Sequence, residues 1–461
     1  MRTERDSMGE MAVPAQALYG ASTQRAVLNF PISGRGLPPA FIRGLGLVKR
    51  VCAEVNAELG RLDRTKADAI IRAAQEVADG QSIEHFPVDV FQTGSGTSTN
   101  MNANEVIANR VSQLAGEPIG SKRPVHPNDD VNLGQSSNDI IPTVLHVSVA
   151  LALRQTLRPA LVHLQQQLAE KARRFDSIVK IGRTHLMDAT PLTLGQEFSG
   201  YAAQMEKAVE RIDRAVQTLT ELAIGGTAVG TGINGHPEFA QRVCARLAEV
   251  TGIPFVEARN HFEAQGARDD AVEVAGVLAT VAASLTKIAN DIRLLGSGPR
   301  SGLGELKLPA TQPGSSIMPG KVNPVMSEML VQVGIYVQGL STSVQIAGRD
   351  GHFELNVTIP LIAYALHESV TCLANAARVF AEQCVAGLEA DEARCRELVD
   401  RSLMLVTALN PHIGYDRAAQ VAKEAYATGR TLREVVLAKG WLDEQTLDRA
   451  LDPVSMVRPR A

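Results

Sequence analysis

Residues 271–295 read AVEVAGVLATVAASLTKIANDIRLL. Drawn as a helix, this stretch is apolar on nearly every side, whereas a helix at a protein surface is apolar along one stripe only. A helix that is apolar all round belongs at the centre of a bundle. The stretch therefore predicts a mainly α fold with packed helices at its core.

Four further stretches with helical periodicity flank this segment. In the first of them, leucines recur at steps of three and four residues, which places them along one helix face. Pro159 falls inside that stretch and is expected to kink the helix, because proline lacks the backbone N–H that a helix interior needs. The five predicted helices cover residues 153–168, 198–222, 271–295, 326–346 and 361–386.

The length of these helices bears on assembly. A helix of about 20 to 30 residues is about 30 to 45 Å long, which exceeds the width of one small domain. We expect the apolar faces left over on such rods to pack against copies of the same chain. The sequence therefore predicts a homo-oligomer.

The texture of the sequence changes at two points. Residues 1–134 mix short helical patterns with Pro and Gly, residues 135–392 carry the long helices, and residues 393–461 return to short helices with turn signals. We therefore predict an N-terminal mixed, mostly helical domain, a central long-helix domain and a small C-terminal helical domain, with these boundaries.

The composition argues against nucleic-acid-binding, secreted and membrane-spanning proteins. The net charge is −4, and no cluster of Lys and Arg provides the basic surface that nucleic-acid binding requires. The charged amino terminus lacks the apolar core of a secretory signal, and no uninterrupted apolar run approaches the roughly 20 residues of a membrane span. The five cysteines are scattered, which is typical of reduced thiols. We expect a cytoplasmic protein with no metal, no cofactor and neither nucleic acid nor membrane as a partner.

Polar segments that interrupt the helical pattern are candidates for chemistry. The first is rich in Gly, Ser and Thr, whose backbone N–H and hydroxyl donors suit an anionic oxygen, although a surface turn has the same composition. In the second, Ser136, Ser137 or Asn138 is expected to cap a helix that begins near Pro142, leaving N–H groups that attract anions. The four segments are residues 92–100, 126–139, 182–188 and 314–324.

The third and fourth segments add groups that move or stabilise charge. His185 can transfer protons near neutral pH, and Thr184 beside it can donate a hydrogen bond. The fourth segment superficially resembles a phosphate-binding P-loop, but its spacing is one residue too long and Val322 replaces the magnesium-binding Ser or Thr. Nucleotide binding is therefore rejected. What remains is a Gly- and Pro-punctuated loop that holds two serines, a lysine and an asparagine close together.

The fourth segment, GSSIMPGKVNP at residues 314–324, resembles the signature loop of the fumarase/aspartase superfamily, whose members eliminate a group β to a carboxylate. The other three segments match the remaining active-site regions of that superfamily in the same order. Within it, the chain is most similar to class II fumarases, because Gly320 precedes Lys321 and residues 406–415 resemble the fumarase carboxy-terminal domain.

The resemblance implies a three-domain fold whose central bundle of five long helices assembles into a tetrameric helical core, with active sites shared between subunits. It implies a lyase that interconverts fumarate and (S)-malate, a small dicarboxylate, by stepwise proton abstraction and loss of water through an aci-carboxylate intermediate. By the same resemblance Ser315 removes the carbon-bound proton, and His185 acts on the departing hydroxyl through a water. Glu328 would pair with that histidine.

The resemblance also assigns binding residues. Implied substrate contacts are Ser95, Gly96, Thr97, Ser136, Ser137, Asn138, Thr184, Ser316, Lys321, Val322 and Asn323. An implied second anion site near the active-site entrance comprises Arg123, His126, Pro127, Asn128 and Asp129. The chain departs from the family there, because Asp130 stands where many fumarases have histidine, and an added negative charge would weaken that site.

Other interpretations stay open from the residues alone. Aspartate ammonia-lyase uses the same loop and the same carbanion chemistry with a different leaving group, and the run Val325-Met326-Ser327 departs from the best-known fumarases. A non-catalytic helical scaffold would be favoured by loss of Ser315 or His185, and both are present. A metal-dependent hydro-lyase is disfavoured, because no cysteine cluster or spaced His/Asp ligand set occurs.

Overall fold

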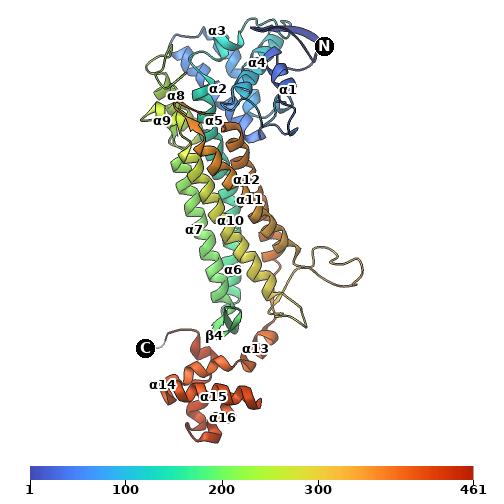
Figure 1. The fold of residues 1–461 in the computed structure, drawn as a ribbon, viewed down its shortest axis with the longest axis vertical. Helices are drawn as coiled ribbons and strands as arrows, with labels where there is room; N and C mark the ends of the chain where they lie inside the picture. The colour runs from blue at the N-terminus through green and yellow to red at the C-terminus, as the bar shows by residue number, and fades with distance from the viewer. Residues whose placement is uncertain (460–461) are drawn as a thin grey trace. The chain divides into compact units, whose positions relative to one another are not determined.

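The computed structural model describes residues 1–459, and most of its elements are helices (Figure 1). The chain divides into two compact units. The first unit contains Met1–Pro159, Val209–Ala282 and Val333–Asn375; the second contains Ala160–Ala208, Ala283–Gln332 and the chain from Ala376 onward. The predicted domain boundaries after residues 134 and 392 stay a prediction.

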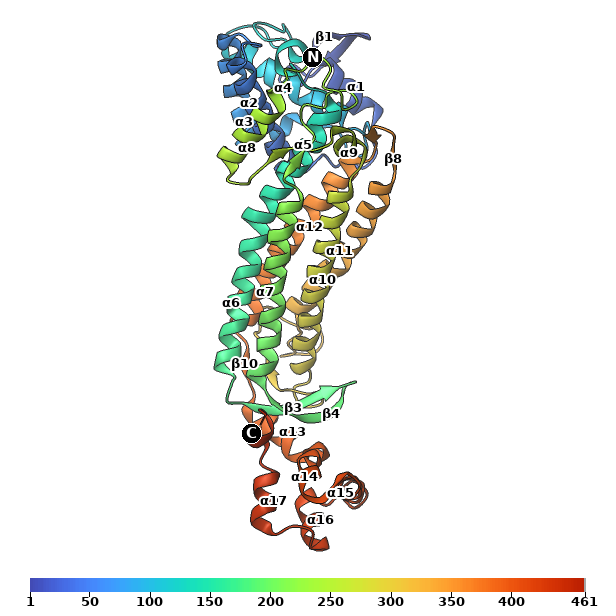
Figure 2. The ribbon, with the colours of Figure 1, turned by 90° about the vertical axis from the view of Figure 1, so that its left-hand side faces the viewer.

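The five predicted long helices are all present, and within each unit their segments lie side by side (Figures 1 and 2). The second predicted stripe is slightly too long, because its helix ends at Thr218 and Leu222 instead belongs to the short parallel pair of strands β5 (Glu221–Leu222) and β6 (Val256–Glu257). The helices are α6 (Arg158–Arg174), α7 (Leu194–Thr218), α10 (Asp269–Leu295), α11 (Val325–Arg349) and α12 (Ile359–Phe380).

The helix that contains Pro159 is irregular just before the proline, whereas the predicted kink stays a prediction. Helix α5 (Ser137–Ala152) passes through a π-helical turn, Leu153–Leu157, directly into α6. Proline cannot donate to the carbonyl four residues earlier, and its ring collides with that carbonyl in a regular α-helix. The wider π turn just before Pro159 relieves this collision and keeps the helix continuous.

Helix α10 is only partly covered within one chain. Of its most apolar 18-residue window, 44% is buried, whereas the corresponding window of the continuous helix Ser137–Arg174 is 72% buried. Both helices are long and apolar enough to cross a membrane by length and composition, a test that core helices of soluble proteins also pass. The predicted central position of α10 is therefore only partly realised inside a single chain.

The remaining helices of the first unit pack against one another and against α5. They are α1 (Ala21–Asn29), α2 (Pro39–Glu58), α3 (Arg64–Ala78), α4 (Thr97–Leu114), α8 (Phe239–Thr251) and α9 (His261–Gly266). The strands of the described residues pair only two at a time. These pairs are β1 (Arg2–Asp6) with β2 (Gly9–Val13), β3 (Val179–Thr184) with β4 (Met187–Thr193), β5 with β6, β7 (Leu306–Lys307) with β10 (Glu389–Ala390), and β8 (Gly351–His352) with β9 (Leu355–Asn356).

The carboxy-terminal part of the second unit consists of short helices, as predicted. Leu409, Val421, Val435 and Leu447 are fully buried in a core of their own, which also takes in Ile181 of β3. The core therefore ties these helices to the hairpin β3–β4. The helices are α13 (Glu392–Arg401), α14 (Asn410–Ile413), α15 (Tyr415–Thr428), α16 (Leu432–Lys439) and α17 (Glu444–Ala450).

Candidate active site

The first polar segment forms the start of α4 and is not a surface turn. Ser95 is buried, and Gly96 is the N-cap residue with φ of 75°, a left-handed conformation that favours glycine. A Cβ atom on Gly94 would lie 1.7 Å from the carbonyl oxygen of Val357, so only glycine fits this close approach of two chain segments. The segment is therefore built to bring α4 against the chain that follows β9.

The second polar segment caps α5, as predicted for Ser136. Its side chain accepts a hydrogen bond from the Asn138 N–H, and the Asp139 carboxylate accepts one from the Ser136 N–H, which together form a capping box. The helix begins at Ser137, earlier than the predicted start near Pro142. The capping box fixes the start there, and Pro142 lies inside the helix.

Hydroxyl groups join the two helix starts. The hydroxyl oxygens of Ser95 and Thr97 lie 2.8 Å apart, and those of Thr97 and Ser137 lie 2.7 Å apart. Helix N-termini carry unpaired N–H groups and a partial positive charge, which favour a bound anion. The convergence of α4 and α5 therefore makes a cluster of donors suited to a carboxylate.

A glycine-rich loop completes this cluster and was missed in the sequence. The Asn138 side chain donates to the carbonyl of Ala228 at 2.8 Å, and Asp139 accepts from the N–H groups of Gly225 and Thr227. Burial raises the pKa of Asp139 to about 6, although these N–H groups oppose the shift. The dense glycines of residues 225–235 resemble the first polar segment in composition and were the available signal.

The third polar segment is the tip of the hairpin β3–β4. His185 and Leu186 form a two-residue turn with φ of 56° and 62°, a conformation in which glycine and asparagine are favoured. Holding His185 and Leu186 in this left-handed conformation costs about 1–2 kcal/mol for each residue. Both side chains are exposed, and the His185 ring has no hydrogen-bond partner among residues 1–459. Stored strain that presents an unpaired imidazole is typical of a functional site.

A buried charge cluster supports the base of this hairpin and was also missed. Arg183 binds both carboxylate oxygens of Glu305, at 2.8 and 3.3 Å, and Glu305 is fully buried. Lys180 lies 3.2 Å from Glu197 and 3.6 Å from Glu305. Burial raises the pKa of Glu197, and the Lys180 charge opposes that shift. Because Arg183 lies two residues before His185, the cluster fixes the strand that carries the histidine.

The fourth polar segment is a loop held by its own backbone. The Gly314 N–H donates to the Lys321 carbonyl at 3.0 Å, and the Asn323 side chain donates to the Gly314 carbonyl at 2.6 Å. The Ser315 hydroxyl oxygen accepts from the N–H groups of Ile317 and Met318, at 3.3 and 3.0 Å. Donors directed at this oxygen stabilise its deprotonated form, which a serine needs in order to act as a base.

The predicted residues thus form two groups. In the first unit, Ser95, Thr97, Ser137 and Asn138 are joined by hydrogen bonds. The second unit holds the hairpin tip with Thr184 and His185, the loop with Ser315, Ser316, Lys321, Val322 and Asn323, and Glu328 in the first turn of α11. Within the described chain, neither the His185 ring nor the Glu328 carboxylate forms an ion pair, so their pairing stays a prediction.

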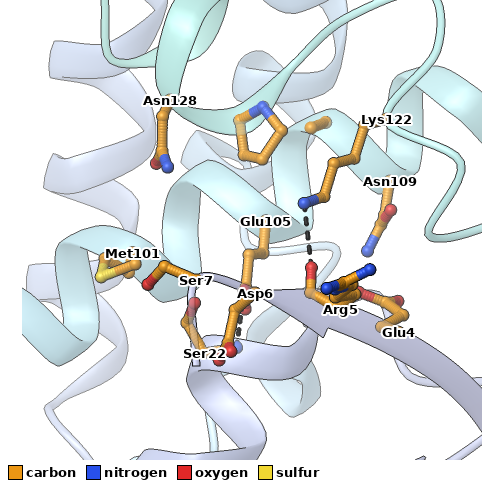
Figure 3. A pocket seen from close by; sticks show the side chains of 12 residues that line it. Glu4, Arg5, Asp6, Ser7, Ser22, Met101, Glu105, Asn109, Lys122 and Asn128 are labelled. Carbon is orange, nitrogen blue, oxygen red and sulfur yellow. Dashed lines mark hydrogen bonds between the residues drawn. The ribbon is translucent and has the colours of Figure 1, made fainter. Parts of the chain in front are cut away.

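The predicted second anion site lies partly on a small cavity of the first unit. Pro127, Asn128 and Lys122 line a cavity of about 110 Å³. Figure 3 shows the hydrogen bond that the Lys122 Nζ donates to the Arg5 carbonyl, which is 3.0 Å long. Arg123 is not among the lining residues and lies 3.4 Å from Glu117.

Two side chains at or beside this predicted site, those of His126 and Asp130, already have partners inside the protein. The His126 Nδ1 atom accepts from the N–H groups of Asn128 and Asp129, so its 3.2 Å approach to the Asp129 carboxylate is not an ion pair in this geometry. Asp130 pairs with Lys66 at 3.0 Å and accepts from the His126 N–H at 2.7 Å. The negative charge of Asp130 is therefore compensated inside the protein.

Comparisons with known proteins agree with this arrangement. The family described as lyase matches residues 9–339, and the family described as fumarase C C-terminus matches residues 405–458. A fumarate hydratase class II from Bradyrhizobium diazoefficiens is 54% identical over 99% of this chain and 97% of its own length. The mitochondrial fumarate hydratase of Rattus norvegicus is 51% identical over 100% of this chain and 91% of its own length.

Solved structures point the same way. The class II fumarase of Schistosoma mansoni has a TM-score of 0.97 and 41% identity, with all of both chains covered. A fumarate lyase from Brucella melitensis, solved bound to cobalt, has a TM-score of 0.95 and 45% identity over 99% of this chain and all of that one. None of these comparisons supports an aspartate ammonia-lyase. The chain belongs to the class II fumarases, within the lyase family of the fumarase/aspartase superfamily.

Proposed function

We propose that this chain is a fumarate hydratase, which adds water to fumarate to give (S)-malate and catalyses the reverse reaction, a step of the tricarboxylic acid cycle. The observation that carries the proposal is the meeting of α4 and α5, where the Thr97 and Ser137 hydroxyls lie 2.7 Å apart at two helix N-termini. Full-length relatives that are named fumarate hydratases support the same reaction.

The chemistry requires stabilisation of a dianion that gains further negative charge. Removal of the proton next to a carboxylate spreads charge onto that carboxylate, and preorganised donors directed at such charge are worth about 10²–10³ in rate for each donor. In this proposal the α4–α5 cluster of one subunit holds one substrate carboxylate, and Lys321 and Asn323 with Thr184 and Ser316, contributed by other subunits, surround the remainder.

Proton transfer is assigned to the second unit. Ser315 takes the carbon-bound proton. Its deprotonated oxygen is stabilised by the two backbone N–H groups from which it already accepts hydrogen bonds. His185 protonates the departing hydroxyl through a water, and Glu328 raises the proton affinity of the imidazole when the two meet. The reaction as proposed uses no metal and no cofactor.

Assembly into a homotetramer is part of the proposal. Helix α11 exposes Ile335 by 66% and Ile346 by 50%, and α10 is only partly buried in one chain. Apolar faces of this kind are expected to pack against other copies. Active sites shared between subunits would then pair the His185 ring and the Glu328 carboxylate, neither of which forms an ion pair within residues 1–459. We further propose that the protein works in the cytoplasm, and that a second anion site is formed by Arg123, His126, Pro127, Asn128 and Asp129.

The proposal is tested by incubating the purified protein with fumarate, with and without ammonium, and identifying the product. Malate formation that needs no ammonium supports fumarate hydratase, and aspartate formation would replace it with an ammonia-lyase. Sedimentation during dilution tests the shared sites, because dissociation to single chains should abolish activity. Full specific activity of a dissociated chain would contradict that part.

A further inference from the structure

Lys49 of α2 is a fully buried lysine. It contacts the segment that immediately precedes α5. Its Nζ donates to the side-chain oxygen of Asn132 at 3.0 Å and to that of Gln135 at 2.9 Å. Within residues 1–459 it forms no ion pair with a carboxylate. A buried ammonium without a counter-ion loses a large hydration free energy, which an apolar side chain would not. Its presence therefore calls for a function.

The partners of Lys49 lead to both halves of the hydroxyl cluster. Gln135 immediately precedes Ser136, the N-cap residue of α5, and its carbonyl accepts from the Asn132 side chain at 3.1 Å. Asn132 also accepts from the Asn100 side chain at 3.2 Å, and Asn100 lies in the first turn of α4. One ammonium group thus holds the turn that begins α5 and connects it to the start of α4.

We propose that Lys49 is a positioning residue of this site: its ammonium sets the geometry of the α4 and α5 N-termini and supplies the positive charge that a bound substrate carboxylate neutralises. The inference rests on the proposed hydratase function. It assigns part of the substrate affinity to a residue that touches no substrate.

The electrostatic surroundings of Lys49 leave its positive charge only partly compensated. Burial lowers the pKa of Lys49 to about 7, and the titratable groups that act against this shift are Cys52 on the same helix and Asp139 on α5. The Asp139 carboxylate accepts its hydrogen bonds from the N–H groups of Ser136, Gly225 and Thr227 and not from Lys49, so it compensates the ammonium only from a distance. A substrate carboxylate at the α5 N-terminus would complete the compensation and favour the protonated lysine.

The decisive experiment measures fumarate hydration by Lys49→Met, which keeps the volume and removes the charge. We expect KM to rise about tenfold or more while kcat changes by less than about threefold, because binding is lost in the ground state and the transition state alike. The matched control is Lys171→Met in α6. Lys171 is also buried, at 4% exposure, and donates to the carbonyls of Ala386 and Leu388, away from every predicted site residue.

The control separates function from stability. Both variants should lose thermal stability, and only Lys49→Met should raise KM. An unchanged KM in Lys49→Met, or the same KM change in both variants, would overturn the proposal. If the wild-type protein hydrates no fumarate, the proposed function fails instead, so the two failures are distinguishable.

A second measurement applies if Lys49→Met does not fold. Binding of succinate to the His185→Asn variant is followed at pH 8 by calorimetry in two buffers of different ionisation enthalpy, with the histidine absent so that it contributes no proton. Net proton uptake on binding supports the proposal, because a carboxylate above Lys49 favours the charged amine. Binding without proton uptake, or no binding, would overturn it.

Discussion

The hydroxyl cluster at the starts of α4 and α5 and the hairpin tip with its loop are built in opposite ways. In the cluster, Ser95, Thr97 and Ser137 already satisfy one another, and buried residues fix them from below. At the hairpin tip, His185 and Leu186 are exposed and held in strained backbone conformations. The first region is joined by hydrogen bonds within one chain, whereas in the second the His185 ring has no hydrogen-bond partner among the described residues. We infer that the first region determines affinity and the second determines turnover.

The largest effect is expected from the second region. His185→Asn and Ser315→Ala should each lower kcat by about 10²–10⁴, the usual contribution of a positioned acid or base. Because both positions lie at surface turns, the thermal midpoint should stay within about 2 °C. Steady-state kinetics with a melting curve checks both statements. Wild-type turnover from either variant would remove that residue from the mechanism.

The buried support of the hairpin should behave differently from its tip. Glu305→Ala leaves Arg183 without its carboxylate partner in a largely buried environment and leaves Lys180 with Glu197 alone, which is expected to cost about 3–5 kcal/mol of stability. Activity should fall through loss of folded protein. Urea unfolding gives the difference, and a loss below about 1 kcal/mol would show that the cluster does not hold the hairpin.

A pH dependence should single out the first region. The pKa of Asp139 is raised in the folded state from 3.8 to about 6, so the folded protein binds the proton more tightly than the unfolded chain. Protonation therefore stabilises the fold, and this contribution, at most about 3 kcal/mol, is lost as pH rises from about 4 to about 6. Unfolding free energies of the wild type and Asp139→Asn across that window test this. The same slope in both proteins would contradict it.

The smallest effect is expected from the N-cap residue of α5, in the hydroxyl cluster. Ser136→Ala removes the N-cap of α5 and should cost about 1 kcal/mol of stability. Because the cap also shapes the anion-binding helix start, KM for fumarate should rise while kcat changes little. Ser402→Ala, which removes the side-chain acceptor for Met404 N–H in the carboxy-terminal helices, is the matched control and should leave KM unchanged.

Much of the fold was determined by the sequence alone, because the signals are local. Apolar periodicity placed α6, α7, α10, α11 and α12, and a π turn lies directly before the proline that was expected to kink the first of them. Ser136, Ser137 and Asn138 were all predicted as candidate caps because their side chains are short and polar, and Ser136 is the one that caps α5. Helix ends were predicted less accurately. Helix α7 ends at Thr218 because the residues that follow pair as a strand with residues 256–257, which lie far away in the sequence.

Tertiary structure alone decided which groups meet. The contact between Thr97 and Ser137, the ion pair between Arg183 and Glu305, and the hold of Lys49 on Gln135 join residues 40 to 122 positions apart. No periodicity or cap carries information over such distances, and a buried lysine or glutamate looks like an exposed one in the sequence. Burial gives these charges and hydroxyls their strength, because only in a desolvated interior does the geometry of a few donors outweigh the competition of water.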